Sequence, residues 1–319
     1  MKYSILIVTY DRADLLQKCI SEIRHQAPEV PILVGINGND PKSSQYLQNI
    51  SQVTFKSFPK MTPGEVRNEL IKLVETPWIC FLDDDIIPCE DYFKIAQGNI
   101  ELKSLDIFGG PDTSYPNESR LEAAISLALT SPLATAHSRK RHVVSNQFKS
   151  DATEQDLILC NLWMKTSIFH KEKNSFDSRF FRNEENVLLN KLLKEGKTTH
   201  YYGNLFVHHK RKSNLFHMIF TVMKSANFRM KSFLFYPNSF QPIYLVPSIA
   251  FLYLVYIALF PSVLLSIPLF IYLISLITLS WKICSKEKRM NLFFQVILIQ
   301  GLINLSYGIG FISPPRPIK

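Results

Sequence analysis

The first half of the chain alternates between short apolar runs and segments in which apolar residues recur at helical spacing. Continuous β-rich runs predict strands at residues 4–10, 31–36, 78–82 and 105–108. Apolar positions three or four apart predict helices at residues 12–26, 64–74, 91–100 and 186–195. Strands that alternate with helices predict a doubly wound, mostly parallel α/β sheet, which binds ligands at the carboxyl ends of its strands.

Two long stretches in the second half of the chain carry no charge. Residues 232–281 and 291–315 lack Asp, Glu, Lys and Arg altogether. A bilayer core needs about 20 apolar residues per spanning helix, and a soluble core helix seldom runs that far without a charge. We therefore expect about three transmembrane helices, near 243–260, 262–281 and 291–313. The third contains Gln295, Gln300 and Asn304, which are expected to line a helix interface.

A segment with the pattern of an interfacial helix precedes these stretches. Residues 214–235 combine many apolar positions with Lys224, Arg229 and Lys231. A helix of this kind lies in the membrane interface with its apolar face turned toward lipid. The predicted domains are an α/β domain at 1–212, an interfacial amphipathic segment at 213–242 and a transmembrane region at 243–319.

The net charge of +9 is unevenly distributed. No acidic residue occurs between Glu195 and Glu287, whereas basic residues are frequent there. A basic excess beside apolar spans marks the cytoplasmic face, which meets anionic lipid. Because the loop at 282–289 is also basic, we expect a cytoplasmic α/β domain, an external turn at 261–262 and an external C-terminus. Nucleic-acid binding would also explain basic charge, but the clustering at the membrane junction disfavours it.

Targeting signals and cysteines agree with a cytoplasmic location. The apolar run at 4–8 is interrupted by Asp11 and Arg12, and it is too short for a secretory signal. The five cysteines are odd in number and form no C-x-x-C pair. Reduced thiols in a cytosolic domain are the expected state.

Three adjacent aspartates, Asp83, Asp84 and Asp85, follow the strand predicted at 78–82. Neighbouring carboxylates repel one another, and a divalent cation among them removes that cost. Asp83 and Asp85 face the same side if the strand continues. We expect Mg²⁺ or Mn²⁺, held by one or two of these carboxylates and by substrate phosphates. The alternative is a solvated acidic turn.

A second acidic pair, Glu184 and Glu185, precedes the helix predicted at 186–195. Asn183 is expected to cap this helix and Gly196 to end it. Taken alone, the pair is explained by the preference for acidic residues in the first turn of a helix.

Together these pieces resemble the family 2 glycosyltransferases of the GT-A fold, over roughly residues 3–213 and in the family's order. The motifs that carry the resemblance are S-I-L-I-V-T-Y-D-R at 4–12, G-x-x-R-N at 64–68, D-x-D at 83–85, G-G-P at 109–111, and F-D-S-R-F at 176–180 before the acidic pair. Val207-His208-His209 is similar to the late histidine motif that can complete the family's metal site.

The resemblance implies a role for each motif. It implies Glu185 as the catalytic base, and Asp83, Asp85 and His209 as metal ligands, with His208 as the alternative histidine. The implied nucleotide-sugar contacts are Thr9, Tyr10, Asp11, Asn37, Arg67, Asp83, Asp84 and Gly110. The candidates for acceptor binding are Glu184, Arg139 and Arg141. The two arginines belong to a basic run at 138–142 that is otherwise a solvated loop or a lipid contact.

Two positions depart from the family pattern. The expected base is Glu185 where the family has an aspartate, so its reach is one methylene longer. Ile36 stands where the family often has an aspartate that reads the nucleotide base, and Asn37, Asn39 or Asp40 are the possible substitutes. The nucleotide is therefore left open.

The implied reaction is an inverting transfer from a nucleotide-sugar donor. The metal neutralises the leaving nucleoside diphosphate, and Glu185 accepts the proton of the attacking acceptor hydroxyl. The apolar segments point to an acceptor presented by the membrane, most plausibly a polyprenyl-diphosphate-linked glycan. We expect the enzyme in the bacterial inner membrane, in cell-surface polysaccharide synthesis.

Three other functions fit the sequence less well. A nucleotidyltransferase needs a glycine-rich loop after the first strand, and residues 9–14 contain no glycine. A processive polysaccharide synthase is disfavoured because the chain has no Q-x-x-R-W sequence and no membrane segment before the α/β domain. A non-catalytic membrane scaffold with the same fold is disfavoured by the intact Asp83, Asp85 and Glu185.

Overall fold

The computed structural model describes residues 2–102, 104–171 and 173–314. The chain forms two compact units, each made of two separate stretches. The first unit contains Met1–Tyr115 and Val143–Lys210, and the second contains Pro116–His142 and Arg211–Lys319. The insertion at 116–142 therefore belongs to the same unit as the C-terminal helices.

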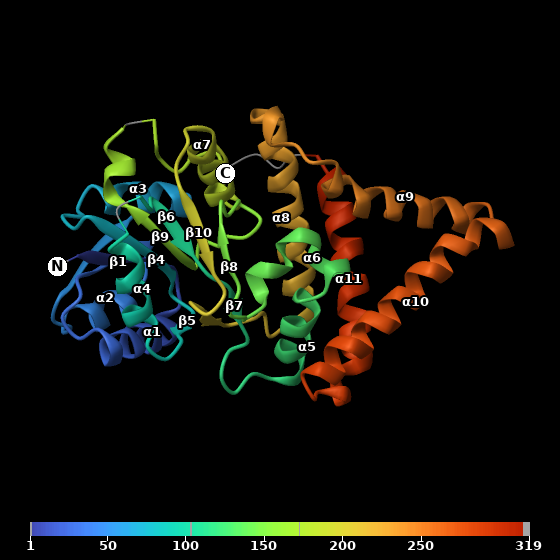
Figure 1. The fold of residues 1–319 in the computed structure, drawn as a ribbon, viewed down its shortest axis with the longest axis horizontal. Helices are drawn as coiled ribbons and strands as arrows, with labels where there is room; N and C mark the ends of the chain where they lie inside the picture. Colours follow the sequence, from blue (N-terminus) through green and yellow to red (C-terminus); the bar gives the residue numbers. More distant parts are fainter. Residues whose placement is uncertain (1, 103, 172, 315–319) are drawn as a thin grey trace. The chain divides into compact units, whose positions relative to one another are not determined.

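The first unit is built on an eight-stranded sheet with strand order β3-β2-β1-β4-β9-β6-β10-β8 (Figure 1). These strands are β1 (Tyr3–Thr9), β2 (Ile32–Asn37), β3 (Val53–Phe58), β4 (Trp78–Asp83), β6 (Ile107–Gly109), β8 (Phe148–Ser150), β9 (Asn161–Lys165) and β10 (Thr199–Tyr202). β1 to β4 run parallel, whereas β9 is antiparallel to β4 and β6, and β8 is antiparallel to β10. The prediction of a mostly parallel α/β sheet is confirmed.

Helices cover both faces of this sheet. They are α1 (Ala13–Gln26), α2 (Pro41–Leu47), α3 (Pro63–Ile71), α4 (Tyr92–Ile100) and α7 (Glu184–Lys194), with a short 3-10 segment, η2 (Thr166–His170). Successive side chains of a strand point to opposite faces. Ile5 and Ile7 of β1 accordingly join a core with residues of α1 and α4, whereas Leu6 joins a core with residues of α3 and α7.

A smaller sheet of three short strands has the order β5-β11-β7. Its strands are β5 (Ile86–Pro88), β7 (Asp112–Thr113) and β11 (Val207–His209). β11 runs antiparallel to β5, which sets His209 opposite Ile86, and parallel to β7, which sets Val207 opposite Asp112. The aspartate triplet, the glycine loop and the late histidines are thereby brought together from three distant parts of the sequence.

The second unit is helical in the part of the chain that the structure describes. Its helices are α5 (Arg120–Leu129), α6 (Pro132–Thr135), α8 (Leu215–Phe235), α9 (Val246–Leu259), α10 (Val263–Lys286) and α11 (Phe293–Ile312), with 3-10 segments η1 (Ala136–His142), η3 (Pro237–Ser239), η4 (Pro242–Leu245) and η5 (Met290–Leu292). Three segments, Pro242–Leu259, Val263–Lys286 and Met290–Ile312, are long and apolar enough to cross a membrane.

Polar residues of α11 lie where the sequence predicts a helix interface. The Gln300 side chain donates to the Ser280 hydroxyl of α10 over 2.7 Å, and Asn304 donates to the Tyr272 hydroxyl over 2.8 Å. Gln295 is half-buried. Interhelical hydrogen bonds of this kind satisfy polar groups in an apolar surrounding.

The tight packing of Gly110 yields a test of the fold. A Cβ atom at this position would lie 1.9 Å from the Leu205 carbonyl oxygen and 2.5 Å from that of Tyr202. Gly110→Ala should therefore destabilise the protein by about 2 kcal/mol or more, because backbone must move to admit the methyl group. The measurement is the thermal unfolding midpoint of the purified protein.

Gly98→Ala is the matched control for this substitution. Gly98 is exposed in α4, and a Cβ there has no atom within 4 Å. Alanine should leave the midpoint unchanged or raise it, by up to about 1 kcal/mol of helix propensity. Equal midpoints for the two variants would contradict the packing described for Gly110.

Candidate active site

The parallel strands end side by side, and their ends carry the first site residues. Val8 of β1 is in register with Asp83 of β4, and Thr9 is in register with Ile36 of β2. The residues that follow, including Asp84, therefore meet at one edge of the sheet, as expected for the carboxyl ends of parallel strands.

Arg12 and Thr9 hold two of the three aspartates. The Arg12 guanidinium donates to Asp85 Oδ2 over 2.7 Å and to Asp84 Oδ1 over 3.0 Å. The Thr9 hydroxyl donates to Asp84 Oδ2 over 2.7 Å, so both oxygens of this buried carboxylate are bonded. The Asp84 carboxylate therefore serves to hold Thr9 and Arg12 in place. The Asp83 side chain, in contrast, is partly exposed.

His209 reaches the aspartates because β11 lies against the turn that follows them. The Lys210 amide donates to the Asp85 carbonyl over 3.0 Å, which fixes the end of β11 beside that residue. His209 Nε2 lies 3.1 Å from Asp85 Oδ1. On the other side of the ring, Nδ1 lies 2.8 Å from Asp112 Oδ2 and 3.8 Å from Cys160 Sγ. The imidazole is therefore held between two carboxylates.

The donor set fits a divalent cation. Ligand atoms of Asp83, Asp85 and His209 all lie within 4.8 Å of one another. Carboxylate oxygens with one imidazole nitrogen suit Mg²⁺ or Mn²⁺. A carboxylate that bonds the other ring nitrogen, as Asp112 does here, commonly orients a ligating histidine. His208, the alternative histidine, instead places Nδ1 2.6 Å from the Ser114 carbonyl oxygen. The geometry favours His209.

The second acidic pair is connected to this cluster through Arg67. The Arg67 guanidinium lies 2.9 Å from Glu184 Oε1 and 3.5 Å from Asp83 Oδ1, and all three groups lie at the same strand-end edge. Arg67 is fixed in α3, whose first turn carries a complete capping box formed by Thr62 and Glu65. Arg67 thus bridges the two acidic motifs.

Glu185, the predicted base, is buried next to this bridge. Its Oε1 accepts a hydrogen bond of 2.9 Å from the Asn186 side chain. Asn183 stands at the N-cap position of α7, as predicted, but with φ 64° its side chain makes no cap hydrogen bond, and its Oδ1 accepts from Asn186. Gly196 ends the helix with φ 77°, in the left-handed conformation that the prediction requires.

Burial and mutual repulsion shift the protonation of these carboxyl groups. Burial and the neighbouring Asp85 raise the pKa of Asp84 to about 7, although Arg12 opposes the shift. Burial raises the pKa of Glu184 to about 7 as well, against the lowering effect of Arg67. The acidic cluster is therefore short of positive charge even with its arginines in place.

Some candidates for nucleotide contact are exposed, and others are already hydrogen-bonded within the protein. Asn37 donates to and accepts from the Met61 backbone, each over 3.0 Å, and Asp40 accepts from Ser43 as the cap of α2. The Asp11 amide also donates to Asp40, over 3.1 Å. Tyr10 is 49% exposed and has the Lys60 ammonium 2.9 Å from its ring centroid. Among these candidates, Tyr10 has an exposed ring, although the Lys60 ammonium covers one face of it.

The close approach of the Leu205 and Tyr202 carbonyls accounts for Gly110 without any ligand.

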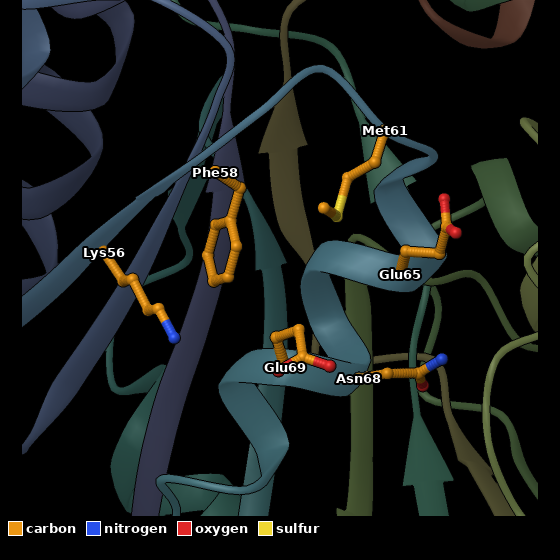
Figure 2. A pocket seen from close by; sticks show the side chains of 6 residues that line it. All are labelled: Lys56, Phe58, Met61, Glu65, Asn68 and Glu69. Carbon is orange, nitrogen blue, oxygen red and sulfur yellow. The ribbon is translucent and has the colours of Figure 1, made fainter.

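An open groove of about 360 Å³ lies between β3 and α3. Figure 2 shows the side chains that line it, which are Lys56, Phe58, Met61, Glu65, Asn68 and Glu69. Asn68 bonds the Phe176 backbone and Glu65 completes the cap of α3, so these side chains serve the fold.

The acceptor candidates fall in different units. Glu184 belongs to the first unit, whereas Arg139 and Arg141 belong to η1 of the second. Arg139 is exposed and Arg141 is buried, so the basic run is not uniformly a solvated loop.

Several residues at the site had no assigned role in the sequence interpretation. They are Arg12, Lys60, Asp112, Cys160 and Arg182. Arg12 was visible as the last letter of the opening motif, and Asp112 as an acidic residue directly after G-G-P. Burial lowers the pKa of Arg182, whereas the charges of Glu184 and Glu185 raise it. No signal in the sequence marked Cys160.

Comparison with known proteins agrees with this geometry. The family model described as Glycosyl transferase family 2 matches residues 4–172. A crystal structure of S. aureus TarS residues 1–349 is similar over 96% of this chain and 89% of that one, at 12% identity and a TM-score of 0.51, which is a likeness of fold alone. A longer TarS structure covers 71% of this chain at 13% identity and a TM-score of 0.48, and this chain spans 39% of its length. Comparison with curated proteins gives no match.

The raised pKa of Glu184 predicts how stability depends on pH. Its pKa is about 7 in the folded chain and about 4.5 when unperturbed, so unfolding releases its proton between these values. The contribution of Glu184 to stability is thus fully present below pH 4.5 and is lost as the pH rises toward 7. Glu184→Gln cannot titrate, and it should gain stability relative to the parent across that window.

The measurement is the difference between the unfolding midpoints of the parent and Glu184→Gln at several pH values from 4.5 to 7.5. A difference that stays constant, or that moves in favour of the parent as the pH rises, would show that Glu184 ionises normally in the folded protein.

Proposed function

This chain belongs to glycosyl transferase family 2, and we propose that it is an inverting, metal-dependent enzyme that transfers a sugar from a nucleotide-sugar donor to a glycan presented at a membrane. The observation that carries the proposal is the convergence of Asp83, Asp85 and His209 with the acidic pair Glu184 and Glu185 at the strand ends. Cation ligands and a base for the acceptor hydroxyl are the two components that such a transfer requires.

Asp83, Asp85 and His209 are the residues that would hold the cation. A bound Mg²⁺ or Mn²⁺ would neutralise the charge that develops on the leaving nucleoside diphosphate. Asp112 holds His209 through Nδ1 and leaves Nε2 turned toward Asp85, the orientation that a ligating histidine needs. Arg12 and Arg67 add fixed positive charge at the same edge.

The acceptor hydroxyl needs a proton acceptor, and Glu185 is proposed for this role. As the acceptor oxygen forms its bond to the anomeric carbon, its proton passes to the Glu185 carboxylate. The bond from that carbon to the diphosphate breaks, and its electron pair leaves with the diphosphate. Asn186 fixes one oxygen of the carboxylate, and Arg67 engages Glu184 rather than Glu185. Glu185 thus remains the better placed of the two acidic residues for general-base work.

The acceptor is proposed to be a polyprenyl-diphosphate-linked glycan at the cytoplasmic face of the membrane. Three segments are apolar enough to cross a bilayer, and an enzyme attached to the membrane by them would meet acceptors presented at its surface. α8 combines exposed Phe216 and Phe220 with the exposed Lys224, as an interfacial helix does. Arg139 and Arg141 of the second unit offer guanidinium groups that suit a diphosphate.

The proposal is tested by a donor-hydrolysis screen with the full chain. UDP-, GDP- and dTDP-sugars are each supplied with Mn²⁺ or Mg²⁺, and release of the nucleoside diphosphate is measured. We expect one nucleotide class to be hydrolysed and the others to be refused. If the folded protein binds no sugar nucleotide at all, a non-catalytic scaffold with this fold replaces the proposal.

Removal of the metal should abolish turnover. We expect excess EDTA, or Asp85→Ala, to lower the rate by at least about 100-fold, equivalent to roughly 3 kcal/mol of transition-state stabilisation. Asp85→Ala should also weaken Mn²⁺ binding, measured by the electron paramagnetic resonance signal of free Mn²⁺. Asp14→Ala removes an exposed carboxylate of α1 and serves as the control. Full turnover by Asp85→Ala in EDTA would refute a metal-dependent mechanism.

Substitution of the two glutamates separates their roles. Glu185→Gln should keep donor affinity and lower the turnover number by about 100-fold or more, because only proton transfer is lost. Donor affinity is measured by calorimetry and turnover by product formation at saturating donor. Should Glu184→Gln be inactive while Glu185→Gln turns over normally, the base is Glu184 instead.

The basic run is tested through acceptor use. Arg139→Ala combined with Arg141→Ala should raise the KM for a lipid-linked acceptor and leave donor hydrolysis intact. Arg139→Ala alone, at the exposed position, should show a smaller change in the same direction. Lys42→Ala removes an exposed cation of the first unit as a control. A loss of membrane affinity that added anionic lipid restores, with an unchanged KM, would assign the run to lipid contact.

A further inference from the structure

The three apolar helices of the second unit close into a triangle. α9 begins beside the C-terminal end of α11, where the Ser248 hydroxyl donates to the Gly308 carbonyl over 3.0 Å. α10 ends beside the N-terminal half of α11, where Gln300 bonds Ser280. α9 and α10 meet at their far ends, where the Tyr253 hydroxyl donates to the Leu265 carbonyl (Figure 1). These two contacts lie eight positions apart on α11, about 12 Å along its axis.

The N-terminal end of α11 is tied to the insertion that carries α5. Arg289 forms an ion pair of 2.7 Å with Glu118, whose side chain is buried, and Arg120 donates to the Asn291 carbonyl over 3.0 Å. The first unit, called the catalytic unit below, has Tyr115 as the last residue of its first stretch. Glu118 follows Tyr115 by only three positions. This end of α11 therefore stays on the membrane side that holds the catalytic unit.

The C-terminal end of α11 is tied to α8. The Asn227 side chain donates to the Gly310 carbonyl over 3.3 Å and to the Ser313 carbonyl over 2.9 Å, and Gly310 packs directly on the Met223 backbone. α8 begins five positions after Lys210, the last residue of the catalytic unit.

α8 itself is unsuited to crossing a bilayer. It carries Lys224, Arg229 and Lys231, and it is not among the segments of the described chain that are apolar enough to span. Charged side chains at the bilayer centre are costly. Because α8 stays on the catalytic side, the C-terminal end of α11 that it holds stays there too.

The surface of α11 agrees with a helix that lies along the membrane. Its exposed large side chains are Phe294, Leu298, Leu305 and Ile312, which fall on one narrow stripe at helical spacing. The remaining faces pack on other helices of the unit, and residues such as Val296 and Ile303 are buried. One apolar stripe over a packed body is typical of a helix at the lipid interface.

The tip of the hairpin has the composition of a segment that stays in lipid. Leu259, Phe260, Val263 and Leu264 are between 58% and 85% exposed, and residues 232–281 contain no charge. Pro261 has no amide hydrogen, and the carbonyl of Ser262 accepts hydrogen bonds from both the amide and the hydroxyl of Ser266. The Ser262 carbonyl is thus satisfied locally, as hydrocarbon requires.

Length also limits how far the tip can reach. α9 has 14 residues, about 21 Å, and begins against α11, where Ser248 bonds Gly308. Its far end therefore lies no more than about 21 Å from α11, short of the roughly 30 Å hydrocarbon core.

We propose that α9 and α10 form a re-entrant hairpin that dips into the bilayer and returns to the face it entered, while α11 lies along that face. The hairpin's partner is the lipid bilayer itself, and the C-terminus remains on the catalytic side. The inference rests on the proposed membrane location of the enzyme. It differs from a three-span arrangement, which places both the turn at 261–262 and the C-terminus outside the cell.

Cysteine accessibility in the full chain distinguishes the two arrangements. The parent has five buried cysteines and serves as the blank. Ser262→Cys marks the tip, Lys319→Cys the C-terminus, and Lys288→Cys the loop before α11. Each variant is treated with a membrane-impermeant maleimide in intact cells, in inverted membrane vesicles and in detergent, and its donor hydrolysis is measured to confirm a native fold.

A re-entrant hairpin predicts that Lys288→Cys and Lys319→Cys label in inverted vesicles and not in intact cells. Ser262→Cys should label only in detergent. Labelling of Lys319→Cys or Ser262→Cys in intact cells would overturn the proposal. Recovery of the active chain in the soluble fraction without detergent would also overturn it, whereas the catalytic proposal would survive that result because donor hydrolysis is scored independently.

Discussion

The arrangement of the first unit depends on how it balances buried acidic charge. Asp84, Asp85 and Glu184 are buried within a few ångströms of two arginines, Arg12 and Arg67, that come from separate helices. Removing one partner of such a buried pair leaves an uncompensated charge and is strongly destabilising. The network therefore holds the starts of α1, α3 and α7 at one edge of the sheet. In the proposed function, a divalent cation and a nucleoside diphosphate would bind to charges that the fold has already collected there.

The sequence was sufficient to predict the elements whose pattern is strong. The strands containing Ser4 and Trp78 are mostly apolar and almost wholly buried, and the predicted sheet, flanking helices and apolar C-terminal segments are all observed. β3 at the sheet edge alternates between exposed and half-buried residues, and the strands of the small sheet have at most three residues. Such segments bury too little to leave a periodic signal, and long-range pairing decides their structure.

The same distinction separates the site residues that the sequence could predict from those that it could not. Asp83, Asp85, Glu184 and Glu185 are recognisable because each motif follows or opens a strong element, whereas Asp112 and Cys160 become neighbours of His209 only through the register of β7 and β11 and the fold around them. Local sequence carries no information about that register. Asn183 shows the converse limit, since it stands at the predicted N-cap position but its side chain bonds Asn186 rather than the first backbone amides of α7. In the second unit, the hydropathy pattern predicts the apolar helices. The ion pair of Arg289 with Glu118 and the hydrogen bond of Asn227 to the Ser313 carbonyl constrain their topology, and these contacts are visible only in the tertiary structure.

The most direct test of the account is a crystal structure of the protein with Mn²⁺ and the nucleoside diphosphate that it selects. Anomalous scattering locates the metal independently of any assumption about its ligands. The charge-balance account predicts one Mn²⁺ peak bonded to Asp85, with Asp83 and His209 around it and the Arg12 guanidinium moved away from Asp85. A saturated crystal in which Mn²⁺ lies elsewhere, or in which Arg12 still pairs with Asp85 and no metal is seen between the aspartates and His209, would contradict it.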